Sequence, residues 1–435
     1  MESGRIVAVI MAGGMGERLR PLSDVRAKPA VPFGGVYRII DFSLSNCINS
    51  GVRRIFVLTQ YKSHSLSNHL KAGWNFLSRR LGQFIDEIPA QMQMGDQWYK
   101  GTADAIRQNM SLIERADPQR VLVLSGDHIY KMDYRLMERY HQEHKACVSV
   151  GAVRVDVDVA RGQYGVLQVD GTGRITGFQE KPQDPQIIPG THQCYASMGV
   201  YMFEADCLPE CLRHHCDDFG RDIIPSMVEA NRPVYAYDFN ELNHIAESEY
   251  VTREGLRTRE LVQRASDSDY WRDVGTIDQF WLANLDLVAP KPRFNLYGEK
   301  WPVFNVPQHF PPAKFVHEVD GRVGMAVNSI VADGVIISGA QVRNSVLSAG
   351  VYVHSYGLIE NSVMFGGSIS GGSRIETSIG RRCRIRNAII DKNVMLSEDT
   401  VIGYNRGDDE RRGLSTHDLP GTDQYIVVVP KWFSL

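Results

Sequence analysis

The chain has 435 residues, which is too long for one ordinary hydrophobic core, so we expect two domains. Apolar residues make up 43% and charged residues 23%, a composition that argues against a disordered chain, and the net charge of -3 offers no basic field for nucleic acid. No apolar run reaches the roughly 18 residues of a membrane-spanning helix. The 7 cysteines are scattered and no signal-peptide pattern precedes the first apolar run, which predicts reduced thiols and a cytoplasmic protein.

The first apolar run, residues 6–12, is rich in β-branched residues and predicts a strand buried in a parallel sheet. Gly13, Gly14 and Gly16 follow it and permit a sharp turn whose backbone N–H groups form a concave anion site. Arg18 adds a fork of donors suited to phosphate. The spacing matches neither the dinucleotide fingerprint nor the Walker loop. The turn therefore favours a polyphosphate site, with a plain tight turn as the alternative.

Further apolar runs alternate with helical stretches through the first 290 residues, at 53–60, 119–127, 146–153 and 197–203. This alternation predicts an α/β domain with a Rossmann-like, mainly parallel sheet. Ligands of such sheets lie beyond the carboxyl ends of the strands, so the glycine turn and Asp127 are expected in one cleft.

Two aspartates are candidate metal ligands. Asp127 ends an apolar run, and Asp273 lies in YWRDVGT, so both could hold a hard cation over a polyphosphate for nucleotidyl transfer. The alternative for Asp127 is a helix cap. Glu180 and Lys181 precede Pro182, which predicts extended backbone with the two side chains on opposite sides. Lys181 would meet a phosphate and Glu180 sugar hydroxyls; a functionless surface turn is the alternative.

A segment with three cysteines and two histidines raises the question of a zinc site. The pattern places Cys207 and Cys211 on one face of a helix, with His214, His215 and Cys216 beyond it. The C-x-x-C pairs of structural zinc sites are absent, so the sequence disfavours zinc.

The C-terminal part has a different pattern. Prolines interrupt residues 289–317, and beyond them apolar residues recur about every six positions, most cleanly at Val363, Ile369 and Ile375 and less regularly at Val346, Val351, Ile385 and Ile390. A six-residue step predicts a β-solenoid, with a turn-rich β domain as the alternative. We therefore expect a catalytic domain at 1–290, a proline-rich linker at 291–320 and a hexapeptide-type solenoid at 321–435.

Several motifs in this order carry a resemblance to a known family: GGMGERLRPL (13–22), RAKPAVPFGG (26–35), WYKGTADA (98–105), FQEKP (178–182) and YWRDVGT (270–276). Over nearly its whole length the chain resembles the glucose-1-phosphate adenylyltransferases, which are sugar nucleotidyltransferases. The resemblance implies Mg²⁺-dependent transfer of the adenylyl group of ATP to α-D-glucose 1-phosphate, the first committed step of glycogen synthesis. It also implies a C-terminal left-handed β-helix that serves oligomerisation and regulation, and a homotetramer.

The resemblance assigns roles to residues of this sequence. It places ATP at Gly13, Gly14, Arg18, Lys28, Gln91, Gly101 and Thr102, and glucose 1-phosphate at Tyr99, Gly165, Glu180, Lys181 and Ser197. The residues expected to carry the reaction are Arg18, Lys28, Asp127, Lys181 and Asp273, of which Asp127 and Asp273 would hold magnesium.

Regulation and three alternatives stay open. Val25 stands where some family members carry an activator-binding lysine, yet a phosphorylated effector is expected at some of six arginines: Arg26, Arg38, Arg384, Arg386, Arg411 and Arg412. The alternatives are a non-catalytic regulatory subunit, a UTP- or dTTP-dependent sugar-1-phosphate nucleotidyltransferase, and an acyltransferase with His354 as base. The regulatory subunit is disfavoured because the charged residues of the expected site are all present. The acyltransferase is disfavoured because a polar edge residue is the simpler interpretation of His354.

Overall fold

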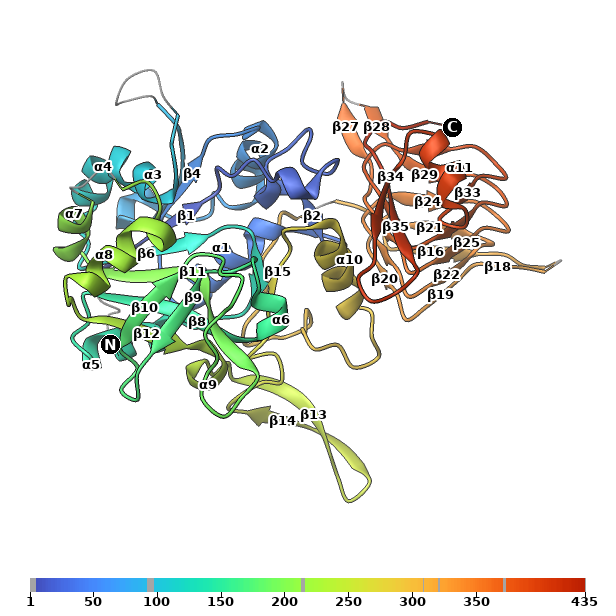
Figure 1. Cartoon of the computed structure of the whole chain (residues 1–435). Coiled ribbons are helices and arrows are strands. Elements are labelled where there is room, and N and C mark those ends of the chain that lie inside the picture. Colours follow the sequence, from blue (N-terminus) through green and yellow to red (C-terminus); the bar gives the residue numbers. More distant parts are fainter. Residues whose placement is uncertain are drawn as a thin grey trace. The chain divides into compact units, whose positions relative to one another are not determined.

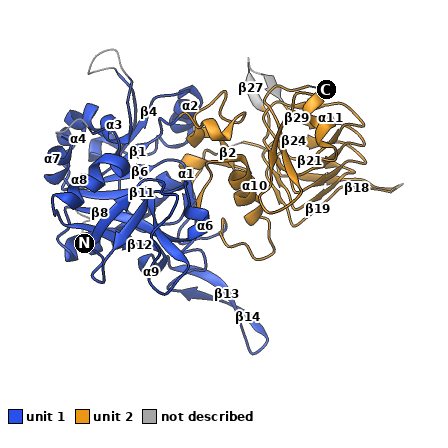
Figure 2. Ribbon diagram, in the orientation of Figure 1, with its two compact units in different colours: residues 1–14, 42–271, 297–303 blue, residues 15–41, 272–296, 304–435 orange. Residues whose placement is uncertain are grey.

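The computed structural model describes residues 5–91, 98–212, 216–307, 309–319, 321–370 and 373–434, without the side chains of 368–375 (Figure 1). The chain divides into two compact units, and each is described by itself (Figure 2). Unit 1 contains residues 1–14, 42–271 and 297–303. Unit 2 contains residues 15–41, 272–296 and 304–435.

Unit 1 is built on a 9-stranded sheet whose main path runs β10-β9-β11-β6-β1-β4-β5. β1 pairs in parallel with β4 and β6, and β5 extends the parallel part to one edge of the sheet. β11 runs antiparallel to β6, β8 and β9, so the other half of the sheet is mixed. The strands are β1 (Ile6–Met11), β4 (Arg54–Thr59), β5 (Phe84–Pro89), β6 (Arg120–Ser125), β8 (Val148–Asp156), β9 (Val166–Val169), β10 (Ile175–Gln179), β11 (Gln193–Glu204) and β12 (Val234–Asp238).

The helices and remaining strands of unit 1 surround this sheet (Figure 1). The helices are α1 (Ile39–Asn49, which begins in unit 2), α2 (His64–Gly73), α3 (Thr102–Gln108), α4 (Met110–Arg115), α5 (Tyr134–Glu143), α6 (Val157–Ala160), α7 (Cys207–Cys211), α8 (Ile224–Glu229) and α9 (Phe239–Leu242). Short helical turns are η3 (Arg79–Leu81) and η4 (Phe219–Ile223), and further strands are β7 (His128–Tyr130), β13 (Glu247–Arg253) and β14 (Leu256–Val262). Residues of β1 such as Val7 and Val9 are fully buried, as a strand covered on both faces requires.

Unit 2 combines an N-terminal segment with a solenoid. Before the solenoid it contains η1 (Glu17–Leu19), η2 (Lys28–Ala30), β2 (Pro32–Phe33), β3 (Tyr37–Arg38) and α10 (Ile277–Asp286), and β15 (Trp271–Asp273) crosses the unit boundary. The first solenoid sheet is β16 (Lys314–Val316), β21 (Ile336–Ser338), β24 (Val351–Val353), β29 (Thr377–Ile379) and β32 (Met395–Leu396). The second is β19 (Met325–Val327), β22 (Gln341–Arg343), β25 (Leu358–Glu360), β30 (Arg384–Arg386) and β33 (Val401–Ile402). The third is β20 (Ile330–Val331), β23 (Val346–Leu347), β26 (Val363–Met364), β31 (Ala388–Ile390), β35 (Tyr425–Val429) and β34 (Ser415–Asp418), and the outlying elements are β17 (Glu318–Val319), β18 (Arg322–Val323), β27 (Ser368–Ser370), β28 (Ser373–Ile375) and α11 (Arg406–Arg411).

The solenoid confirms the predicted β-helix architecture, although its period differs locally from the predicted step. Val346 stacks on Val363, and Val363 on Ile389, in parallel register, so successive coils bury one continuous core. The step was expected to be cleanest at residues 363–375, yet an antiparallel hairpin of β27 and β28 interrupts the coil there. Short apolar segments with turn-forming residues between them are compatible with a hairpin as well as with a solenoid coil. The sequence pattern therefore did not distinguish the two.

The cysteines depart from the expected reduced state. Cys147 and Cys207 form a disulfide across a sequence separation of 60 residues, so the expectation of reduced thiols is wrong for this pair. Their bonding also removes Cys207 from any zinc set, while Cys211 is a free thiol and His214 and His215 lie outside the described residues. The two cysteines are distant in sequence, and their pairing depends on how β8 and α7 fold together.

Part of the predicted linker packs into unit 1. The Trp301 side chain is buried, and its indole N–H donates to Asn46 Oδ1 at 3.0 Å. Within the described residues, no helix combines the length and apolar character needed to cross a bilayer.

Candidate functional site

The glycines of the turn after β1 differ in their surroundings. A Cβ at Gly13 would lie 3.1 Å from Gln60 Cβ, whereas a Cβ at Gly14 would meet nothing within 4 Å. Gly16 has a φ of +64°, and the Ser23 hydroxyl donates to its carbonyl oxygen at 2.7 Å. Because L side chains rarely adopt this conformation, glycine is required at position 16. Arg18 lies at the exposed surface of η1.

Two of the predicted catalytic residues form an ion pair in unit 2. Lys28 Nζ lies 3.2 Å from Asp273 Oδ1, and the two side chains are only 9% and 13% exposed. Gly275 permits this arrangement, because a Cβ there would lie 3.0 Å from both carboxylate oxygens of Asp273. A cation and a carboxylate held together away from water interact more strongly than they would at the surface.

Asp127 follows β6 through Gly126 in unit 1. A Cβ at Gly126 would lie 3.0 Å from the Met11 carbonyl oxygen, so glycine lets this turn pass close to β1. The Asp127 carboxylate accepts a hydrogen bond from Ser125 Oγ. The next element is β7, and α5 is instead capped by Asp133, which accepts from Arg135 N at 3.0 Å. The alternative of Asp127 as a helix cap is therefore excluded.

Trp271 belongs to this neighbourhood, and no role was predicted for it. Its ring lies 5.0 Å from that of His128 and 5.5 Å from that of Tyr164, measured between centroids. Its buried indole N–H has no hydrogen-bond partner among the described residues. An unsatisfied buried donor calls for an explanation, and a bound ligand would provide one. The sequence feature that could have pointed to Trp271 is its position in the motif YWRDVGT.

The predicted geometry of Glu180 and Lys181 is wrong. Lys181 has a φ of +46°, and its Nζ lies 3.7 Å from Glu180 Oε1, so the two side chains lie on the same side. The physical reason is tertiary: the Lys181 N–H donates to the Tyr164 carbonyl oxygen at 3.1 Å. This contact outweighs the preference for extended backbone before proline.

Four of the predicted sugar-phosphate residues, Gly165, Glu180, Lys181 and Ser197, lie together in unit 1. The Ser197 N–H donates to the Gly165 carbonyl oxygen at 2.8 Å, and a Cβ at Gly165 would lie 3.1 Å from Glu180 Oε2. Burial raises the pKa of Glu180, opposed by Lys181 and reinforced by Asp218. Asp218 was not predicted, and its position after the cysteine segment carries no recognisable motif.

Asp218 connects this cluster to the predicted nucleotide residues. Thr102 Oγ1 donates to Asp218 Oδ2 at 3.1 Å and accepts from the Phe219 N–H at 3.1 Å. Gly101 precedes α3, and a Cβ there would overlap the Asp217 carbonyl oxygen. Tyr99 is half-buried, and its hydroxyl accepts from Asn109 Nδ2 at 2.9 Å. Gln91 is exposed and follows the end of β5.

The six candidate effector arginines separate into two groups in unit 2. Arg26 pairs with Asp391. Arg38 lies near enough to Arg26 for the two guanidinium groups to repel each other. Burial, followed by repulsion from Arg38 and Arg26, lowers the pKa of Lys392 to about 7. Burial, followed by repulsion from Arg26, lowers the pKa of Lys431 as well. Neither lysine was predicted, because the sequence does not distinguish a lysine that folding buries from one that stays at the surface.

The second group surrounds the end of the solenoid. The guanidinium carbons of Arg384 and Arg386 lie 4.6 and 4.5 Å from the Tyr404 ring centroid. Arg411 pairs with Asp408, and Arg412 donates to the Val401 carbonyl oxygen at 2.6 Å. Burial and the crowding of cations lower the pKa of Lys392 and Lys431 beside the first group, so the first group is the stronger candidate for an anion.

Comparisons with known proteins show the family of the chain. A nucleotidyl transferase family model matches residues 7–289, and a model of the GlmU-like C-terminal hexapeptide matches residues 311–419. Glucose-1-phosphate adenylyltransferase 2 of Pseudoalteromonas atlantica is 45% identical over 431 residues, covering 98% of this chain and 94% of that protein. The glucose-1-phosphate adenylyltransferases of Shewanella oneidensis and Methylococcus capsulatus are 46% and 45% identical, each covering 93% of this chain and 91% and 90% of their own lengths. The chain is therefore a nucleotidyltransferase and belongs to the glucose-1-phosphate adenylyltransferase family.

Proposed function

We propose that the protein transfers the adenylyl group of ATP to α-D-glucose 1-phosphate, which yields ADP-glucose and diphosphate. The observation that carries this proposal is the buried pair of Lys28 and Asp273, a cation and a carboxylate held side by side in a chain of this family. No catalytic serine, cysteine or histidine is required by this chemistry.

The nucleophile is an oxygen of the sugar phosphate. Its second pKa is about 6, so it is ionised at neutral pH and needs no general base. It attacks the α-phosphorus of ATP. The bond between this phosphorus and the oxygen that bridges it to the β-phosphate breaks, and diphosphate leaves. The enzyme has to align two anions and neutralise their charge. Gly13, Gly14, Arg18 and Lys28 perform this task on the triphosphate, and Arg18 assists the departing diphosphate.

Asp127 and Asp273 are proposed to hold Mg²⁺. Carboxylate oxygens are the ligands this hard cation prefers, and when bound it neutralises charge on the phosphates. The support for the pairing is in the sequence, where Asp127 ends the apolar run of β6 and Asp273 lies in the motif YWRDVGT.

The sugar phosphate is assigned to the cluster in unit 1. Lys181 contacts its phosphate, and Glu180 accepts from sugar hydroxyls, since the two side chains lie on the same side. Tyr99, Gly165 and Ser197 complete this part. Gln91 and the Gly101–Thr102 turn are assigned to adenine and ribose.

The first experiment measures diphosphate release with glucose 1-phosphate and Mg²⁺, comparing ATP with UTP, dTTP, GTP and CTP. We expect a strong preference for ATP. Preference for UTP or dTTP would establish the alternative nucleotidyltransferase, and no release with any nucleotide would favour the regulatory subunit. An acyl-CoA turnover assay tests the acyltransferase. His354 instead packs against Tyr352, at 4.1 Å between ring centroids, as a polar edge residue would.

Two variants test the roles of single residues. Asp127→Asn should lower kcat by about a hundredfold or more, because it weakens the metal site. Lys181→Gln should raise the KM for glucose 1-phosphate about tenfold with a smaller effect on ATP. Lys145→Gln, an exposed lysine outside the site, is the control and should change neither. Near-normal turnover in the first variant, or an unchanged KM in the second, would contradict these roles.

We also propose that a small phosphorylated effector binds at Arg26, Arg38, Lys392 and Lys431. The support is the mutual repulsion of these cations, which a dianion would relieve. A screen of phosphorylated metabolites should change the rate or the substrate affinity of the enzyme, and the change should disappear in Lys392→Met. An effect that survives in this variant would place the effector elsewhere.

Assembly, role and location complete the proposal. We propose a homotetramer that uses the solenoid for association and regulation, with residues 1–290 as the catalytic domain, 291–320 as linker and 321–435 as solenoid. Sedimentation at working concentrations tests the assembly. ADP-glucose synthesis would supply glycogen formation in the cytoplasm, where a disulfide such as Cys147–Cys207 is expected to be reducible.

A further inference from the structure

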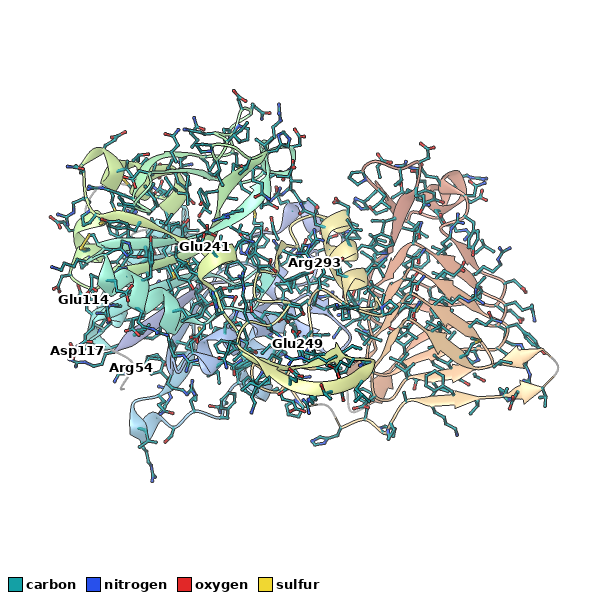
Figure 3. All side chains as sticks on the ribbon, turned by 90° about the horizontal axis from the view of Figure 1, so that it is seen from below. Arg54, Glu114, Asp117, Glu241, Glu249 and Arg293 are labelled. Atoms are coloured by element: carbon teal, nitrogen blue, oxygen red, sulfur yellow. A yellow bond between two sulfur atoms is a disulfide. The ribbon has the colours of Figure 1, made fainter. Side chains whose placement is uncertain are left out.

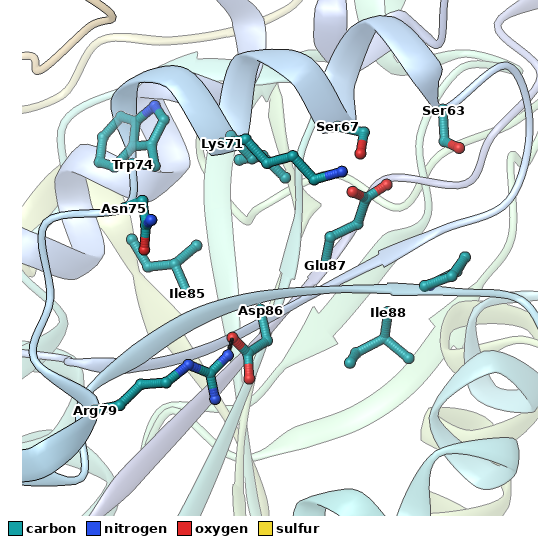
Figure 4. Close-up of a pocket in the computed structure, with 12 residues that line it drawn as sticks. Ser63, Ser67, Lys71, Trp74, Asn75, Arg79, Ile85, Asp86, Glu87 and Ile88 are labelled. Atoms are coloured by element: carbon teal, nitrogen blue, oxygen red, sulfur yellow. Dashed lines mark hydrogen bonds and ion pairs between the residues drawn. The ribbon is translucent and has the colours of Figure 1, made fainter.

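A cavity of about 640 Å³ lies between α2 and β5 in unit 1 (Figure 4). None of the residues assigned above to ATP, glucose 1-phosphate or metal lines it. The volume falls within the range of small-molecule sites, about 300–1,000 Å³. β5 is the last strand at its edge of the sheet, so the cavity lies beside a strand that has a sheet neighbour on one side only.

The helix wall carries a row of polar side chains. Ser63, Ser67 and Lys71 are spaced by four residues, which places them on one face of the helical segment, and Asn75 follows beyond its end. None of these four side chains has a hydrogen bond or ion pair with another described residue. Figure 4 shows Lys71 and Glu87 pointing toward one another across the cavity. The helix wall therefore presents hydroxyl, ammonium and amide groups that are available to a ligand.

The strand wall presents acceptors. Glu87 Oε1 accepts from Thr59 Oγ1 at 3.1 Å, which orients the carboxylate. The neighbouring Asp86 is paired with Arg79. Leu70, Ile85 and Ile88 supply apolar surface between the polar walls.

The charges of the lining cancel. Lys71 and Arg79 are balanced by Asp86 and Glu87, so the lining has no net formal charge. An anion would be attracted by the two basic groups but repelled by the two carboxylates. A cation would be attracted by the carboxylates but repelled by the basic groups. A neutral molecule that donates and accepts at neighbouring atoms matches both walls, and a hydroxyl does both.

We propose that this cavity binds a neutral polyhydroxylated ligand, such as a hexose unit or a short oligosaccharide. Hydroxyl groups of the ligand donate to Glu87 and accept from Lys71 and Ser67, while its C–H faces contact the apolar floor. Phe76, one residue beyond the cavity wall and 54% exposed, offers an aromatic ring on which a further sugar unit can pack.

Isothermal titration of the full chain with maltotriose, glucose and inorganic phosphate tests the proposal. We expect saturable binding of maltotriose with a Kd of about 1 mM or tighter. Inorganic phosphate should not compete with maltotriose. Glucose 1-phosphate should not displace maltotriose, since displacement would place the sugar in the substrate site and overturn the proposal. Absence of saturable binding by either neutral sugar would also overturn it.

Variants locate the binding. Ser67→Phe places an aromatic ring in the cavity and removes a hydroxyl from its wall, so it should weaken maltotriose binding about tenfold or more, whereas Ser111→Phe, at an exposed serine of α4, should leave the affinity unchanged. Lys71→Met removes the ammonium group of an exposed side chain, so it tests the same cavity if Ser67→Phe fails to fold. Unchanged affinity in Lys71→Met, together with unchanged affinity in a folded Ser67→Phe, would refute this location.

Discussion

The Arg26–Asp391 pair joins the N-terminal segment of unit 2 to its solenoid. Both Nη atoms of Arg26 lie 2.9 Å from Asp391 Oδ1, across 365 positions of sequence, and the side chains are 4% and 1% exposed. The backbone N–H of Lys392 donates to the same oxygen at 2.6 Å. Replacing Arg26 by methionine keeps much of the side-chain volume and removes the charge.

The expected loss in the free energy of unfolding follows from the state in which the Asp391 carboxylate is left. Without Arg26 the buried carboxylate keeps hydrogen bonds but has lost its counter-ion, and breaking a buried pair from one side costs about 3–5 kcal/mol. The exposed pair of Arg382 and Asp399, 47% and 61% exposed, lies in the same unit. Water already screens that pair, so Arg382→Met should cost about 1 kcal/mol or less.

Thermal unfolding measures the difference. About 2–4 °C is expected per kcal/mol for a domain of 150–250 residues, so Arg26→Met should lower the Tm by roughly 6–20 °C and Arg382→Met by at most about 4 °C. The double variant Arg26→Met, Asp391→Leu should recover most of the loss, because no unpaired charge stays buried. A shift for Arg26→Met no larger than that of Arg382→Met would refute the reasoning.

Three further predictions concern the backbone, the disulfide and a buried lysine. Gly101→Ala should destabilise by about 1–3 kcal/mol and impair ATP binding, because its Cβ overlaps a backbone oxygen, whereas Gly171→Ala should be tolerated; denaturant unfolding and a KM measurement check both. Cys147→Ser should cost about 4 kcal/mol by opening a loop with a separation of 60 residues, and melting of the variant should no longer respond to a thiol reductant as the oxidised wild type does. The folded pKa of Lys392 is lowered from 10.5 to about 7, so the unfolded chain binds more protons between these values and stability should rise with pH across this window; Lys392→Met should flatten that rise in melts at several pH values.

The glycine turn was predictable because its requirements are local. Apolar β-branched residues followed by closely spaced glycines define a buried strand and a sharp turn whatever surrounds them, and β1 with Gly16 has this form. The conformation of Lys181 was not predictable in this way. Its hydrogen bond to Tyr164 comes from a neighbouring segment and reverses the local preference before proline.

The domain order, the α/β and solenoid architecture and the family motifs were predictable from the sequence, because periodicity and short-range spacing are properties of adjacent residues. Which distant groups meet depends on the packed fold: Lys28 with Asp273, Thr102 with Asp218, Cys147 with Cys207, and Arg26 with Asp391. Each pair joins segments that the chain separates, so its formation depends on packing between elements, and the burial that strengthens or shifts its charges exists only once that packing is complete.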